Sequence, residues 1–115
     1  MEIWINPACS KCRTAKAALD EAGISYTERR YLDDPPTVAE LAEVLDRMGL
    51  QPWDIARPKE TAAAGIVLPR DPEHREEWLA AMAADPATIQ RPIITADDGT
   101  TAVARDEETL ARFIG

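Results

Sequence analysis

Cys9 and Cys12 are the two cysteines of this 115-residue chain, and only two residues separate them. They lie in the segment INPACSKCR, where an apolar run ends at Asn6-Pro7 and a helix is expected to begin near Ser10. A thiol at a helix N-terminus ionises more readily than a free cysteine, because backbone N–H groups and the helix dipole favour the thiolate. Cys12 lies one helical turn further on, within reach of Cys9 if the loop turns back. The pair therefore predicts thiol redox chemistry that starts at Cys9.

Other interpretations of the two cysteines are also possible. A zinc site normally needs four ligands, and the one histidine, His74, has no partner at metal-ligand spacing, so no metal site is predicted. Cys12 falls on the apolar stripe of the expected helix with Ala15 and Leu19, where an unreactive packing cysteine would also lie. Cys9 lies outside this stripe. A Cys-x-x-Cys pair between a strand and a helix is typical of a thioredoxin-like dithiol.

The composition restricts the classes of function. The net charge of −8 argues against a nucleic-acid binder, because such proteins neutralise phosphates with Lys and Arg. No apolar run is long enough to span a membrane. The segment EIWI follows Met1 without a basic leader or a long apolar block, so the cytoplasm is the expected compartment. Structural disulfides are rare there, which favours a redox or metal-binding role for a Cys-x-x-Cys pair.

The N-terminal third of the sequence predicts the beginning of a βαβ unit. The apolar run IWI at residues 3–5 is expected to form a buried strand. A helix should follow from about Ser10 to Ala22, because Gly23 provides a C-terminal stop. The segment ISYTER at residues 24–29 is then expected to be a second strand, which completes strand, helix and strand within about 30 residues.

The middle of the chain is predicted to be helical. Thr37 and Glu40 form a capping-box pattern before a helix that should end at Gly49. Shorter helical stretches are expected in PWDIA and ETAAA, and a longer helix after the Asp71-Pro72 cap. These helices interrupt the sheet.

The last part of the sequence returns to strands. PIIT and TAVA flank Asp98-Gly99, which predicts a β-hairpin, and Asp106 is expected to cap a final helix. The predicted fold is therefore α/β, thioredoxin-like with a central helical insertion. A single domain should span residues 1–115, with a core of about residues 1–32 and 89–115 and an insertion of about residues 33–88.

The segment NPACSKCR resembles the active-site loop of the ArsC arsenate reductase family. Glutaredoxin-coupled members carry Asn-Pro-x-Cys, followed four residues after the cysteine by Arg, and Asn6, Pro7, Cys9 and Arg13 match this pattern. The similarity continues in order through YLDDPPTVAEL, MGLQPWDIAR, IQRPII and TTAVAR, and so covers nearly the whole chain. It implies a thioredoxin-like fold in which a cis-proline, here Pro92, begins the strand that faces the active-site cysteine.

The resemblance also implies a set of site residues. Cys9 would be the nucleophile, Arg57, Arg91 and Arg105 would surround a bound oxyanion, and Asn6 and Arg13 of the cysteine loop would assist binding. Cys12 is added to this set as the candidate second thiol because of its spacing from Cys9, not because of the resemblance. The three arginines stand among apolar or ring neighbours in IARP, IQRPII and AVARD, which favours partial burial, although a surface salt bridge is the alternative for each. Guanidinium groups bind a tetrahedral oxyanion bidentately and offset its repulsion of an attacking thiolate.

Cys12 departs from the pattern of this family. The glutaredoxin-coupled reductases have no cysteine at the position of Cys12 and use glutathione as the second thiol. Here Cys12 could attack the sulfur of Cys9 after arsenate has bound, which would release arsenite and leave a disulfide. The external reductant is then glutathione with glutaredoxin, thioredoxin or another low-molecular-weight thiol, and no bound cofactor is expected.

Two other functions share the same cysteine spacing. The related Spx-type regulators bind RNA polymerase and use a Cys-x-x-Cys disulfide as a redox switch, and a general dithiol oxidoreductase would need no arsenic chemistry. The three arginines favour the enzyme, since a switch needs no oxyanion pocket. The expected partners are arsenate or a similar oxyanion and a thiol-reducing protein, with neither nucleic acid nor a membrane, and the protein is expected to be a monomer.

Overall fold

The computed structural model describes all residues from 1 to 115. The chain forms two compact units that differ in secondary structure. The first unit contains residues 1–34 and 91–115 and carries the β-sheet; the second contains residues 35–90 and is helical. None of the helices combines the length and the apolar character needed to cross a bilayer.

The first unit is built on a four-stranded sheet. Its strands are β1 (Glu2–Ile5), β2 (Thr27–Arg30), β3 (Ile93–Thr95) and β4 (Thr101–Val103), in the spatial order β2-β1-β3-β4. β1 and β2 are parallel, and both β1–β3 and β3–β4 are antiparallel. The pairings that fix the register are Ile5 with Arg30, Trp4 with Ile93, and Ile93 with Val103. The predicted hairpin at Asp98-Gly99 is confirmed, since β3 and β4 flank it.

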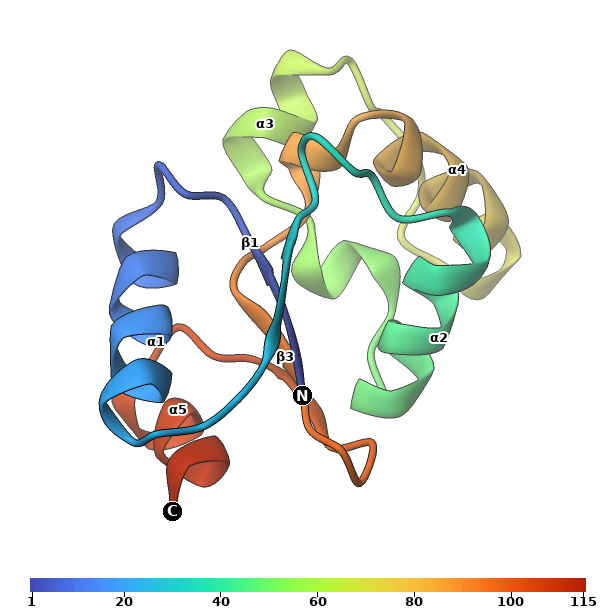
Figure 1. Cartoon of the computed structure of the whole chain (residues 1–115). Coiled ribbons are helices and arrows are strands. Elements are labelled where there is room, and N and C mark those ends of the chain that lie inside the picture. Colours follow the sequence, from blue (N-terminus) through green and yellow to red (C-terminus); the bar gives the residue numbers. More distant parts are fainter. The chain divides into compact units, whose positions relative to one another are not determined.

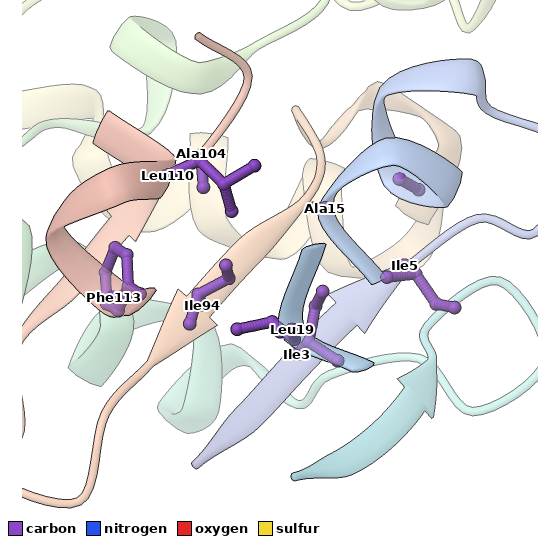
Figure 2. Packing of buried hydrophobic residues seen from close by; sticks show 9 residues of the cluster. Ile3, Ile5, Ala15, Leu19, Ile94, Ala104, Leu110 and Phe113 are labelled. Carbon is purple, nitrogen blue, oxygen red and sulfur yellow. The ribbon is translucent and has the colours of Figure 1, made fainter. Parts of the chain in front are cut away.

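Two helices pack on one face of this sheet. α1 (Ser10–Glu21) connects β1 to β2, and α5 (Glu107–Ile114) ends the chain; the two helices lie side by side (Figure 1). Their apolar stripes meet the inward side chains of β1 and β3, as Figure 2 shows for Leu19 beside Ile3. The resulting core consists of Ile3, Ile5, Cys12, Ala15, Leu19, Ile94, Ala104, Leu110 and Phe113. Burial of each large aliphatic side chain contributes about 1.5–3 kcal/mol, so this core anchors the helix that carries both cysteines.

The second unit contains three helices and three short 3₁₀ turns. The helices are α2 (Val38–Met48), α3 (Pro58–Ala63) and α4 (Arg75–Ala84), and the turns cover Pro52–Ile55, Pro72–His74 and Pro86–Thr88. The predicted capping box is confirmed: the side chain of Thr37 accepts from the N–H of Glu40, whose carboxylate accepts from the N–H of Thr37. α2 ends at Gly49, whose φ of 68° is the left-handed conformation that glycine adopts without strain.

Some predicted boundaries differ from the structure. The strand predicted over ISYTER begins only at Thr27. The preceding residues complete the end of α1 instead: the N–H of Ile24 donates to the carbonyl oxygen of Leu19, and the hydroxyl of Tyr26 donates to Asp20. PWDIA and the first turn after Asp71 are 3₁₀ rather than α-helical, and in both a proline stands at the first position.

Candidate active site

Four polar or ionisable residues come to one edge of the sheet. Asn6 and Tyr31 directly follow the parallel strands β1 and β2, whose paired ends leave the sheet at the same edge. Arg91 precedes β3 and Arg105 follows β4, so these antiparallel strands bring both arginines to that edge as well. The chain then passes from Asn6 through the loop to the N-terminus of α1.

Cys9 is the N-cap residue of α1. Its backbone is extended, with φ −85° and ψ 125°, and its carbonyl oxygen accepts from the N–H of Arg13 at 3.1 Å. The N–H of Cys9 donates to the carbonyl oxygen of Asn6 at 2.9 Å, which closes the loop. The side chain of Cys9 is half-buried and in its free thiol form. The predicted start of the helix at Ser10 is confirmed.

The surroundings of Cys9 favour its thiolate. Burial by itself would raise the pKa of Cys9, but hydrogen bonds outweigh this effect and lower the pKa to about 7. The donors are the backbone N–H and the thiol of Cys12, the backbone N–H of Lys11 and the side chain of Arg91. A substantial fraction of the Cys9 side chains is therefore ionised and nucleophilic at neutral pH.

Cys12 has the opposite character. It is buried, with 1% of its surface exposed. Burial, together with the neighbouring Cys9 thiol, raises the pKa of Cys12 to about 11, although its sulfur accepts from the N–H of Asn6 at 3.5 Å, which favours the thiolate. Cys9 and Cys12 thus form a pair in which one sulfur is ionised near neutrality while the other keeps its proton.

Asn6 and Arg13 hold the loop that carries Cys9. The side-chain oxygen of Asn6 accepts from the N–H of Ala8 at 3.0 Å. The guanidinium of Arg13 lies 3.4 Å from the carbonyl oxygens of both Pro7 and Ala8. Both side chains therefore act on the loop backbone, and their contact with a substrate stays a prediction.

Arg91 and Arg105 are joined through the backbone of Arg91. Nη1 of Arg105 donates to the carbonyl oxygen of Arg91 at 2.7 Å, and Nη1 of Arg91 donates to the hydroxyl of Tyr31 at 3.2 Å. The peptide bond between Arg91 and Pro92 is cis, as predicted. The structure thus gathers Arg91, Arg105 and the two cysteines within the first unit.

Arg57 lies in the second unit, where it is the N-cap residue of α3. Its Nη1 donates to the side-chain oxygen of Gln90 at 3.0 Å, and its Nε is 3.2 Å from the carboxylate of Glu60. Its backbone N–H donates to the carbonyl oxygen of Thr88 at 2.7 Å. These contacts hold the guanidinium in a defined direction, and its membership of the oxyanion site stays a prediction.

Tyr31 is the residue that sequence reasoning missed. It is fully buried, and its hydroxyl is the acceptor for Arg91. The sequence contained only a partial signal for it, because Tyr31 comes two positions after the end of the predicted second strand at residues 24–29, whereas β2 in the structure ends at Arg30 and places Tyr31 beside Asn6. No three His, Cys, Asp or Glu side chains lie close enough together to hold a metal ion.

A parallel βαβ start, an antiparallel hairpin, a cis-proline and a Cys-x-x-Cys pair at the first helix together define a thioredoxin-like α/β protein. The sequence model of the ArsC family matches residues 4–113, and the chain belongs to this family. The predicted fold class and family are thereby confirmed.

Relatives and a solved structure agree with this assignment. An uncharacterized protein in the glnII region of Streptomyces viridochromogenes is 54% identical over 113 residues, covering 96% of this chain and 95% of the relative. An arsenate reductase of Neisseria meningitidis is 34% identical and covers 96% and 94%, respectively. The structure of an arsenate reductase from Vibrio cholerae superposes with a TM-score of 0.81 at 31% identity, over 98% of both chains. The global transcriptional regulator Spx of Staphylococcus epidermidis is 27% identical, over 97% of this chain and 85% of that regulator.

The pKa of Cys9 makes a direct prediction about its reactivity. The rate of Cys9 alkylation by iodoacetamide should rise with pH through a midpoint near 7, since only the thiolate reacts. Cys12→Ala removes the thiol donor to Cys9 and should move this midpoint upward, toward the ordinary value of 9.0. Mass spectrometry of alkylated peptides measures both profiles. A wild-type midpoint near 9 would contradict the arrangement of donors described here.

Proposed function

We propose that the protein is a thiol-dependent oxidoreductase of the ArsC type that reduces arsenate to arsenite. Cys9 is the nucleophile and Cys12 the resolving thiol, while Arg57, Arg91 and Arg105 bind the oxyanion. The observation that supports this most is the half-buried Cys9 at a helix N-cap, with a pKa of about 7, and Arg91 hydrogen-bonded to it. An anion attacked by a thiolate needs such a cation, because the two negative charges otherwise repel each other.

The proposed reaction has two steps. In the first, the Cys9 thiolate attacks arsenic, an S–As bond forms and one oxygen leaves as water or hydroxide, which gives a cysteine thioarsenate. In the second, the Cys12 sulfur attacks the Cys9 sulfur and loses its proton. The electron pair of the S–As bond passes to arsenic, so As(V) becomes As(III), arsenite leaves and a Cys9–Cys12 disulfide remains. Two thiols are oxidised for the two electrons that arsenic gains.

An external thiol must then reduce the disulfide. Cys12 provides the second sulfur internally, which favours thioredoxin or another low-molecular-weight thiol as the electron donor, with glutathione and glutaredoxin as the alternative. We further propose that the protein acts as a monomer in the cytoplasm, where disulfides are kept reduced.

An arsenate reduction assay with the two thiol systems in parallel tests the proposal. We expect arsenite to form with the thioredoxin system or a low-molecular-weight dithiol, without any need for glutaredoxin, because Cys12 is already in place. Turnover that requires glutathione and glutaredoxin would instead mean that Cys12 does not resolve the intermediate. No arsenite with any of these donors would contradict the proposed function.

A redox-sensing regulator is the second candidate. The similarity to Spx and the Cys-x-x-Cys pair favour it. This candidate predicts reversible oxidation of Cys9 and Cys12 without turnover of arsenate. A general dithiol oxidoreductase would reduce disulfide substrates but would show no saturable dependence on arsenate.

A further inference from the structure

We propose that Tyr31 is a positioning residue of this site, whose hydroxyl holds the guanidinium of Arg91 beside the sulfur of Cys9. The inference rests on the proposed function for its kinetic consequence, but not for its effect on Cys9 itself. It assigns a role to a buried polar side chain that the reaction as described above does not use.

The geometry begins with the position of Tyr31 at the end of β2. Tyr31 has no exposed surface, so packing fixes its two side-chain torsions and thereby the position of the hydroxyl oxygen. That hydroxyl lies 3.2 Å from Nη1 of Arg91, which is 60 positions away in the sequence. Tyr31 and Arg91 meet because β2 and β3 both pair with β1.

Arg91 is held at both its ends. The hydrogen bond from Arg105 fixes the carbonyl group of Arg91, whereas Tyr31 contacts the far end of the side chain. A free arginine side chain loses up to about 2 kcal/mol of conformational entropy when it is ordered. Because the Tyr31 hydroxyl already orders the Arg91 side chain in the folded protein, less conformational entropy is lost when Arg91 binds an anion or a thiolate.

The chemical nature of the acceptor is also informative. The hydroxyl oxygen of Tyr31 accepts the hydrogen bond from a guanidinium N–H of Arg91, so this contact directs the guanidinium. The positive charge of Arg91 then acts on the Cys9 thiolate and on the oxyanion in the transition state, as a fixed donor does.

Tyr31→Phe removes the hydroxyl and keeps the ring. Because Arg91 is then less firmly held, the pH midpoint of Cys9 alkylation should rise by roughly half a unit. In the proposed reaction, kcat/KM for arsenate should fall roughly tenfold to a hundredfold, the cost of one hydrogen bond to a charged group. Tyr26→Phe is the matched control, since its hydroxyl contacts Asp20 and neither cysteine. It should leave both quantities unchanged.

A double-variant cycle shows whether Tyr31 acts through Arg91. Tyr31→Phe should cause no further rise of the midpoint in a background that already carries Arg91→Ala. A thermal melt of each variant reports the stability separately. A lower melting temperature with an unchanged midpoint would show a packing role only and overturn the proposal, as would an equal rise of the midpoint in both backgrounds. The alkylation arm stays decisive even if the protein reduces no arsenate.

Discussion

Cys9→Ser is expected to abolish arsenate reduction, with a loss of at least about a thousandfold in kcat/KM, because only the sulfur that attacks arsenic is indispensable. Serine keeps the size of the side chain, but its hydroxyl is not ionised at neutral pH and is not a redox group. Cys12→Ser should retain part of the activity when a small thiol is added, since an external sulfur can attack the Cys9 intermediate in place of Cys12. Arsenite formation at several concentrations of added thiol measures both effects.

A thermal melt of each variant separates lost stability from lost chemistry. Cys9→Ser changes a half-buried residue of the loop, whereas Cys12→Ser changes a residue of the hydrophobic core, so the second substitution is the one expected to lower the melting temperature. Equal and complete loss in both would mean that no external thiol can replace Cys12. Full activity of Cys9→Ser would remove Cys9 as the nucleophile.

Arg91→Ala is expected to lower kcat/KM for arsenate by roughly tenfold to a thousandfold, or about 1.4–4 kcal/mol. Arg91 donates to Cys9 and would also face the charge that develops on the oxyanion. Arg105→Ala should cause a similar loss, because its guanidinium fixes the carbonyl group of Arg91 and is a predicted ligand of the anion. Initial rates over a range of arsenate concentrations give these values.

The rate of thiol–disulfide exchange shows whether Arg91→Ala impairs oxyanion binding or the reactivity of Cys9 and Cys12. At pH 9, above the pKa of Cys9, the cycling of Cys9 and Cys12 with a disulfide substrate should be nearly unaffected by Arg91→Ala, since it needs no oxyanion site. Arg112→Ala is the control, because Arg112 is exposed in the last turn of α5 and pairs with Glu108. An arsenate rate of Arg91→Ala equal to that of Arg112→Ala would contradict the role of Arg91 in binding the oxyanion.

The same two measurements, kcat/KM for arsenate and the rate of thiol–disulfide exchange, test whether Arg57 binds the oxyanion. In the second unit Arg57 is held by Gln90 and Glu60, so its removal also affects local contacts of α3. A loss of kcat/KM comparable with that of Arg91→Ala, without a change in thiol exchange, would support its place among the oxyanion ligands. A loss of thermal stability alone would assign it to the structure of the second unit.

Short-range patterns predicted the elements well. The caps at Thr37 and Asp106 accept the N–H groups expected of them, because a cap depends on residues only three positions apart. The hairpin at Asp98-Gly99 likewise depends on two adjacent residues. The predicted start of β2 was wrong because Ile24 belongs to the C-terminal cap of α1, where its N–H donates to the carbonyl oxygen of Leu19 after the left-handed Gly23, so pairing with β1 begins only at Thr27.

The candidate site was predictable only where it depends on residues close together in the sequence. The Cys9 and Cys12 pair can be recognised within four consecutive residues, and the resemblance supplied the three arginines. The contact between Tyr31 and Arg91 was not predictable, because it joins residues 60 positions apart through the pairing order of three strands. Local propensity contains no information on that order. The sequence therefore identified Arg91 as a candidate site residue but did not show that its guanidinium donates to Tyr31.

Cys12 belongs at once to the hydrophobic core and to the dithiol. A substitution at this position therefore has two separate effects: it changes the packing beneath α1, and it removes a sulfur. Serine packs poorly in the apolar core and is not a thiol, whereas a small aliphatic residue restores only the packing. In the proposed reaction, a different resolving thiol would require a new cysteine elsewhere in the loop, and position 12 could then be an ordinary core residue.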